Sequence, residues 1–181
     1  LRSAGMGGVQ YREWTFPETV SSLGLCQSGD LIAACGMDIL ILNPESGARR
    51  TLHSIPAPEG IACRLNDGRV GPDGAFWVGT MHNVPLSQMQ PHGELWRITN
   101  NGAERIQTGL TCPNGLAFSP DETKLYVADS GASHDPSVPH HIRVFDVVDG
   151  KHVSNGRAFA ASDHDRAGGV RFDRDGGLWS S

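Results

Sequence analysis

Two asparagines and one arginine are spaced so that their side chains could bind a small oxygen-rich molecule or a cation. Asn66 and Asn114 each lie seven residues before an aspartate in a turn, and Arg64 lies two residues before Asn66. An asparagine can coordinate a hard cation through its carbonyl oxygen or donate to a ligand through its amide. An arginine presents a planar fork of donors that suits carboxylate oxygens. The simpler interpretations are turn formation by the asparagines and a solvated surface charge at Arg64, and both stay open here.

The offset from the turns recurs along the chain and defines an internal repeat. The turn residue Asp73 lies 45 residues after Ser28, and Asp175 lies 54 residues after Asp121. This spacing is close to the ~40–50 residues of one four-stranded propeller blade. In a propeller, the positions seven residues before these turns fall at the start of each blade's innermost strand, so we expect them to meet near the central channel. The four equivalent positions are Ser21, Asn66, Asn114 and Gly168.

Short apolar runs separated by turns fill each repeat and predict strands. Asn-Gly and Asp-Gly pairs, as at residues 101–102 and 149–150, supply the positive φ angles that tight hairpins need. No segment keeps the apolar period of a helix, so little helix is expected. The predicted strands cover residues 20–26, 31–34, 39–42, 48–52, 75–79, 94–98, 103–106, 124–128, 141–146 and 153–159.

These repeats predict an all-β propeller, a single domain over residues 1–181 with about three and a half to four blades. A β-sandwich also contains short strands, but it does not predict the same turn motif in every repeat. The chain opens on Leu1 and stops inside a strand-like run at residues 179–181. We therefore expect the first blade to be incomplete and the C-terminal blades of the propeller to be missing.

Composition limits the partners and the compartment. The 181 residues carry a formal net charge of −5 without a basic stripe, which argues against nucleic-acid binding. No apolar run approaches the ~20 residues of a membrane span, so no membrane partner is expected. The four cysteines show no CxxC or zinc-type spacing and predict reduced, mostly buried thiols in the cytoplasm.

Two blocks of the sequence resemble one known family. Residues 64–70, 72–74 and 76–81 resemble the signature block of the regucalcin (senescence marker protein), gluconolactonase and LRE-like family. Residues 113–121 and 125–130 resemble its next block. The resemblance implies a six-bladed propeller that hydrolyses sugar lactones, with one divalent cation in the mouth of the channel. Calcium is the expected ion, with zinc, manganese or magnesium as alternatives.

Carried over residue by residue, the resemblance makes Arg64 and Asn66 substrate contacts and Asn114 a metal ligand. The family's metal-binding and catalytic aspartate falls on Gly168, which has no side chain to bind a cation or accept a proton. The glutamate that the family draws from its first blade has no counterpart here. A hard cation generally takes about six or more oxygen ligands, some of them charged. We therefore expect weak metal binding and assign no catalytic residue.

Four other side chains are candidates for the missing acid or for ligand contacts. Asp163 and Asp165 lie close to Gly168 in the sequence and could supply a shifted carboxylate. Asp129 follows an apolar strand, where it faces either the channel or a strand-end turn. His82 follows a predicted strand and could reach the pocket entrance as a ligand or a base, although a loop histidine is more often solvated.

Two functions of different classes are consistent with these residues, so whether this chain is itself an active enzyme stays open. In the first, a metal-dependent lactonase polarises the lactone carbonyl and directs water onto it. In the second, a propeller with Gly168 in place of the acid binds its ligand without catalysis. A paraoxonase or strictosidine-synthase-like hydrolase is a third interpretation, and the block at residues 64–70 speaks against it. Open blade edges also predict self-association and low activity for the isolated chain.

Overall fold

The protein consists almost entirely of β-strands. The computed structural model describes residues 2–3, 12–131, 140–162 and 167–181. Within these residues the only helical element is one 3-10 turn, η1 (Leu86–Gln88). The strands are β1 (Arg2–Ser3), β2 (Arg12–Glu13), β3 (Val20–Leu25), β4 (Leu31–Cys35), β5 (Asp38–Leu42), β6 (Arg49–Ser54), β7 (Cys63–Val70), β8 (Phe76–His82), β9 (Gly93–Thr99), β10 (Gly102–Leu110), β11 (Pro113–Phe118), β12 (Lys124–Asp129), β13 (His140–Val148), β14 (His152–Ser162), β15 (Val170–Phe172) and β16 (Leu178–Ser180). The predicted all-β class is confirmed, and each predicted strand has a counterpart.

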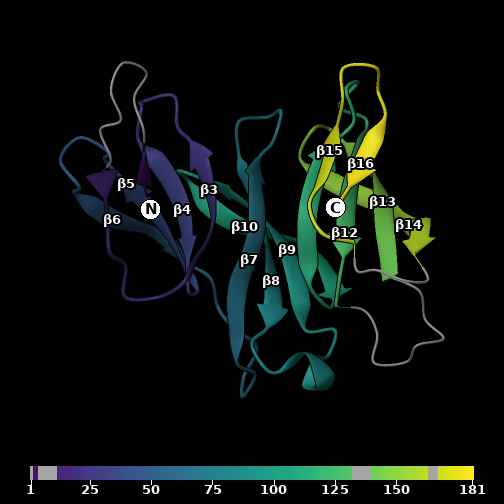
Figure 1. Cartoon of the computed structure of the whole chain (residues 1–181), viewed down its shortest axis with the longest axis horizontal. Helices are drawn as coiled ribbons and strands as arrows, with labels where there is room; N and C mark the ends of the chain where they lie inside the picture. The colour runs from purple at the N-terminus through teal and green to yellow at the C-terminus, as the bar shows by residue number, and fades with distance from the viewer. Residues whose placement is uncertain (1, 4–11, 132–139, 163–166) are drawn as a thin grey trace.

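Three sheets are four-stranded antiparallel meanders, arranged side by side like a fan (Figure 1). Their strand orders are β3-β4-β5-β6, β7-β8-β9-β10 and β11-β12-β13-β14, and β1-β2 and β15-β16 form two smaller sheets. The first strands adjoin one another, because β3 contacts β7, β7 contacts β11 and β11 contacts β15. Sheets that meet through their first strands are propeller blades. The sandwich alternative is therefore wrong, since a sandwich stacks two sheets face to face.

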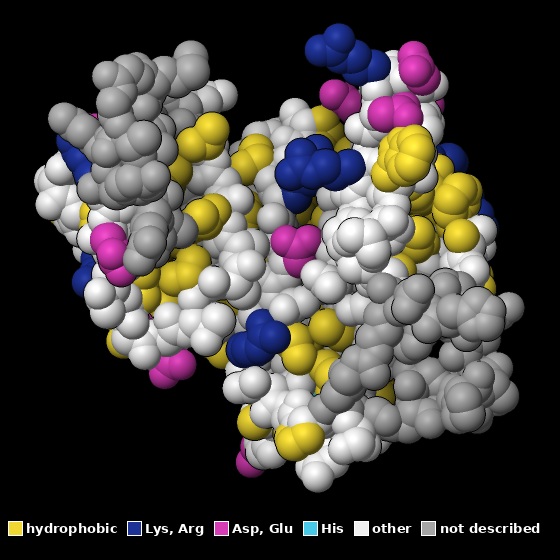
Figure 2. All heavy atoms as spheres, viewed as in Figure 1, with side chains coloured by type: hydrophobic (Ala, Val, Ile, Leu, Met, Phe, Trp, Pro, Cys, Tyr) yellow, Lys and Arg dark blue, Asp and Glu magenta, His cyan; other side chains and the backbone are white. Residues whose placement is uncertain are grey.

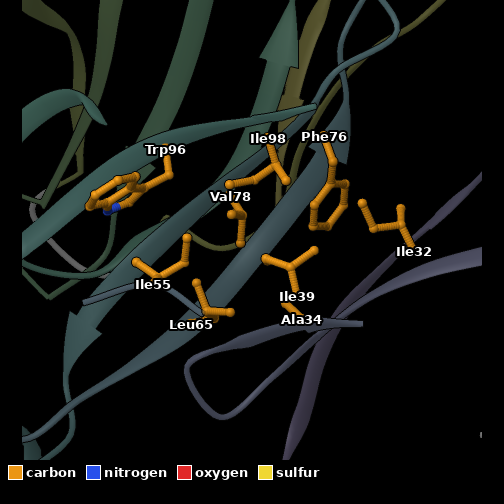
Figure 3. Packing of buried hydrophobic residues seen from close by; sticks show 9 residues of the cluster. All are labelled: Ile32, Ala34, Ile39, Ile55, Leu65, Phe76, Val78, Trp96 and Ile98. Carbon is orange, nitrogen blue, oxygen red and sulfur yellow. The ribbon is translucent and has the colours of Figure 1, made fainter. Parts of the chain in front are cut away.

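The hydrophobic core lies between neighbouring blades. Figure 3 shows Ile32 and Ile39 of the first full blade packed with Phe76 and Val78 of the second. Trp77, which is 0% exposed, belongs to the next cluster, shared with the third blade. Successive side chains of a strand point to opposite faces. Because blades cover both faces of β8, all its residues except the last are buried, as in other doubly covered strands.

The cysteines are less buried than predicted. Cys35 is buried, whereas Cys26, Cys63 and Cys112 are half-buried, and none of the four forms a disulfide. Burial raises the pKa of the thiols of Cys26, Cys35 and Cys63, which favours their less reactive protonated form. A cytoplasmic location stays a prediction. Across the described ranges, no helix has the length and apolar character needed to span a membrane.

Candidate functional site

A cavity of about 300 Å³ lies where β7 and β11 meet the segment that precedes β15. Its wall is formed by Arg64, Asn66, Met81, Met89, Cys112, Asn114, Ser130, Ala167 and Gly168. The structure thus brings together three of the four positions that share the offset from the turns, with Arg64 beside them. Their roles in binding stay predictions.

The inner strands share an irregularity of pairing at the level of this cavity. The regular register breaks after Val20 in β3, after Leu65 in β7 and after Asn114 in β11. An extra residue in one strand of an antiparallel pair bends that strand and re-aims its side chains. Equivalent bulges in successive blades therefore explain why residues far apart in the sequence reach a common wall.

Asp67 connects the bulge of β7 to the bulge of β11. Its Oδ2 accepts a hydrogen bond from the Gly115 N–H at 2.7 Å, and its Oδ1 accepts one from the Gly68 N–H at 2.9 Å. Gly115 has a φ of 75°, and a Cβ placed there would lie 2.5 Å from the Gly168 carbonyl oxygen. Only glycine permits this approach of two inner strands. Asp67 therefore fixes the backbone directly after Asn114.

Asn66 holds Arg64 in place. Nη1 of Arg64 donates to Oδ1 of Asn66 and to the Leu65 carbonyl oxygen, both at 2.9 Å. Nδ2 of Asn66 donates to the Pro113 carbonyl oxygen on β11 at 2.9 Å. Both polar groups of Asn66 are engaged, so this residue positions its neighbours. By contrast, Nε and Nη2 of Arg64 make no hydrogen bond to any described residue, which leaves N–H donors available to a ligand.

Asn114 differs from Asn66 in the hydrogen bonding of its side chain. Its half-buried side chain lies on the cavity wall and forms no hydrogen bond within the described part of the chain.

Asp129 is 4% exposed, and its Oδ1 accepts hydrogen bonds from the Thr111 N–H at 3.0 Å and the Cys112 N–H at 2.7 Å. Asp129 is absent from the cavity wall. The strand-end interpretation therefore applies, and Asp129 holds the segment that leads into Asn114.

The remaining predicted positions do not join the cavity wall. The offset predicts that Ser21 points to the same place as the two asparagines, but Ser21 does not line the cavity, and its buried Oγ has no partner among the described residues. His82 also lies outside the wall; its ring centroid is 5.2 Å from that of His92, and its buried Nδ1 has no described partner. Asp163 and Asp165 lie outside the described residues.

Sequence reasoning missed the sulfur-containing side of the cavity. Met81 and Met89 are both buried, and Sγ of Cys112 lies 3.7 Å from Sδ of Met81. Thioethers and a thiol give this side an apolar, polarizable surface. The available signal was position, because Cys112 comes two residues before Asn114 and Met81 is the next-to-last residue of β8.

The described residues do not fit a tightly bound hard cation. Such an ion takes about six to eight oxygen ligands, usually with several carboxylates. The side-chain oxygens on this wall belong to Asn66, Asn114 and Ser130, with no carboxylate among them, and Oδ1 of Asn66 is already bonded to Arg64. Within the described ranges no group of three or more His, Cys, Asp or Glu residues could hold a metal ion.

Removing the Asp129 carboxylate should loosen the segment that carries Asn114. Asp129→Ala leaves the N–H groups of Thr111 and Cys112 without their acceptor, so we expect the free energy of unfolding to fall by about 2–4 kcal/mol. Amide hydrogen exchange should accelerate most at these two residues. Asp121→Ala is the matched control, because that carboxylate is exposed and bonds only within its own turn; its effect should be much smaller. Equal effects of the two substitutions would contradict the assignment.

Four-stranded blades with polar side chains gathered at the ends of their inner strands define a β-propeller with a ligand-sized cavity beside its axis. The family model for the SMP-30/gluconolactonase/LRE-like region matches residues 4–181. The chain belongs to this family, and the resemblance predicted from residues 64–70 and 113–121 is confirmed.

Two lactonases are among the relatives. The chain is 31% identical over 174 residues to 6-deoxy-6-sulfogluconolactonase of Pseudomonas putida, across 91% of this chain and 54% of that protein. It is 31% identical over 183 residues to L-arabinolactonase of Azospirillum brasilense, across 96% of this chain and 56% of that protein. The chain therefore spans a little over half the length of these relatives.

Solved structures agree with the fold. A luciferin-regenerating enzyme superposes with a TM-score of 0.77 at 24% identity, over 95% of this chain and 58% of that protein. A calcium-binding regucalcin of Agrobacterium tumefaciens superposes with a TM-score of 0.76 at 20% identity, over 94% and 56% of the respective chains. At these identities the likeness concerns the fold. The likeness confirms the predicted fold class, that of the six-bladed β-propellers, and the described blades of this chain are arranged in an arc (Figure 1).

Proposed function

We propose that this chain forms the lactone-recognising part of a sugar-lactone hydrolase. The observation that carries the proposal is the meeting of the Arg64 guanidinium and the Asn114 amide on one cavity wall. Membership of the family and the two relatives named for sugar lactones support it. The sugar lactone is thus the proposed small-molecule partner.

The wall offers groups that complement such a ligand. A sugar lactone carries a ring ester, several hydroxyl groups and apolar C–H faces. The remaining N–H groups of Arg64 can donate to its oxygens, and the Asn114 amide can both donate and accept. Met81 and Met89 provide an apolar surface for the ring. As water attacks, the carbonyl oxygen gains negative charge, so a cationic donor held in place stabilises that state more than the ground state.

Turnover also requires a group that takes a proton from the attacking water. Gly168 cannot do so, and the Asp129 carboxylate is directed to two backbone N–H groups. We therefore propose strong recognition with slow hydrolysis for this chain, and non-catalytic ligand binding is the second candidate that Gly168 favours. We further propose that a divalent cation, calcium first, binds only weakly. Among the described residues, Asn114 is its one predicted ligand.

Lactone binding, measured by calorimetry or NMR titration with freshly dissolved gluconolactone and arabinolactone, tests the proposal. Arg64→Ala and Asn114→Ala should each weaken binding about tenfold or more, because each removes a hydrogen-bonding group of the site. Arg174→Ala, which removes an exposed charge from a distant turn, should leave binding unchanged.

A double-mutant cycle separates direct contact from positioning. If Asn66 acts by holding Arg64, Asn66→Ala should weaken binding, and adding it to Arg64→Ala should cost little more. Wild-type affinity in both Arg64→Ala and Asn114→Ala would exclude this cavity as the lactone site. Rapid lactone turnover by the unmodified chain would instead show that a base exists elsewhere.

A further inference from the structure

Three sulfur-containing side chains lie together on the wall of the candidate site. Met81 comes from the end of β8, Met89 from the segment after η1, and Cys112 from the segment before β11, and all three line the same cavity. Both methionines are buried, Cys112 is half-buried, and Sγ of Cys112 lies 3.7 Å from Sδ of Met81. The lactone contacts proposed above use this side only as an apolar surface, so the capacity of the sulfurs to donate electron pairs is left over.

The three sulfurs form a soft donor set. A thiolate and two thioethers are polarizable ligands, and such ligands select Cu(I) over the hard cations Mg²⁺ and Ca²⁺. Methionine is not among the His, Cys, Asp and Glu ligands whose grouping would mark a conventional metal centre in the described ranges. When Cys112 binds a monovalent ion, its thiol releases a proton. The charges of the thiolate and the ion then cancel, so the half-buried site gains no net charge, whereas an unpaired buried charge would be costly.

The distance between two of the sulfurs suits one shared ion. Two sulfurs that lie 3.7 Å apart, each bonded to one ion at about 2.3 Å, the length of a zinc–thiolate bond, subtend an angle of about 107° at that ion. This angle is typical of a site with three or four ligands. Cys112 and Met81 can therefore bind one ion without a shift of the backbone. Met89 lines the same cavity, and its flexible, unbranched side chain can supply the third sulfur.

Neighbouring residues hold two of these donors in place. Asp129 accepts a hydrogen bond from the Cys112 N–H at 2.7 Å, and Met81 is paired with Arg64 between β7 and β8. Nδ2 of Asn66 donates to Sγ of Cys112 at 3.6 Å, and a donor to the sulfur favours its thiolate form. Groups that orient a metal ligand in advance commonly contribute about 10–100-fold to metal affinity. The arrangement therefore favours binding at Cys112 over binding at an isolated thiol.

The sulfur side of the cavity is accessible from solvent, because Cys112 is only half-buried. Figure 2, in the same view as Figure 1, shows hydrophobic side chains at the surface beside a basic one near the end of β8. We propose that Cys112, Met81 and Met89 bind one soft monovalent cation, Cu(I). The ion would occupy the cavity that Arg64 and Asn114 also line, so it should exclude a lactone. Only this last consequence rests on the proposed function.

Anaerobic titration of the full chain with Cu(I) tests the proposal, with a chromophoric Cu(I) chelator as the competitor. Met81→Leu and Met89→Leu should each raise the dissociation constant about tenfold or more, because each removes a thioether and nearly conserves volume. Met37→Leu is the matched control, since Met37 is a partly buried methionine outside this cavity. Thiol alkylation read by mass spectrometry locates the ion. One equivalent of Cu(I) should protect Cys112 and leave Cys63, an equally half-buried thiol outside the cavity, reactive.

The outcomes separate this inference from the proposed function. Wild-type Cu(I) affinity in both methionine variants would show that a thiol alone binds the ion, and protection of Cys63 before Cys112 would place the ion elsewhere; either result overturns the proposal. Added gluconolactone should compete with Cu(I). A chain that binds Cu(I) at Cys112 but binds no lactone would contradict the proposed function alone. A chain that binds lactone but not Cu(I) would contradict this inference alone.

Discussion

Replacing Trp77 by alanine is expected to lower the free energy of unfolding by about 3–5 kcal/mol. The indole is 0% exposed, packs edge-to-face on Phe118 and donates from Nε1 to Oδ1 of Asp73 at 3.1 Å. The substitution therefore leaves a large cavity between the second and third full blades and deprives Asp73 of a donor. Urea unfolding followed by circular dichroism measures the change.

The chain offers its own control for this experiment. Trp179 occupies the equivalent position, and its Nε1 donates to Asp173, but it is 68% exposed. Trp179→Ala should cost less than about 1 kcal/mol because little apolar contact is lost. If the two substitutions lowered the free energy of unfolding equally, packing between blades would not be the main way in which Trp77 stabilises the protein.

Installing a carboxylate at position 168 should produce the largest functional effect. Gly168→Asp adds a charged oxygen ligand to the wall that already holds Asn114, so we expect tighter calcium binding. The same carboxylate can accept the proton of the attacking water, which typically contributes about 10²–10⁴-fold to the rate. Calcium titration and lactone turnover, measured on the glycine and aspartate forms together, test both expectations.

The structure adds a steric condition to this prediction. A Cβ at position 168 would lie 2.8 Å from Oγ and 2.9 Å from the carbonyl oxygen of Ser181, so the backbone at Ser181 must shift. Gly168→Ala imposes the same shift without the charge and is therefore the reference for Gly168→Asp. If the alanine and aspartate forms bind calcium equally and hydrolyse lactone equally, position 168 is not where the acid belongs. Asp163, Asp165 and Asp129 are then the next residues to substitute.

The strands, the blades and much of the site could be predicted from local signals. Asp-Gly and Asn-Gly turns and short apolar runs depend on the backbone preferences of a few neighbouring residues, so their positions are readable from the chain alone. Because blades are copies of one unit, a constant offset from the turn also predicts a shared place in space. Asn66, Asn114 and Gly168 accordingly meet at one cavity, whereas Ser21, which has the same offset, does not line it.

Tertiary structure alone decided what each of these residues does there. Asn66 and Asn114 have the same residue type and offset, yet among the described residues only the Asn66 side chain finds hydrogen-bond partners, because Pro113 of the next blade lies within reach of its amide. Trp77 and Trp179 follow equivalent turns, yet a neighbouring blade covers only Trp77. Turn chemistry acts within a few residues, whereas burial and hydrogen-bond partners depend on distances between blades that no local pattern encodes. The sequence by itself therefore determined the repeating unit and its polar positions, and the packing of one blade against the next decided which positions stay available to a ligand.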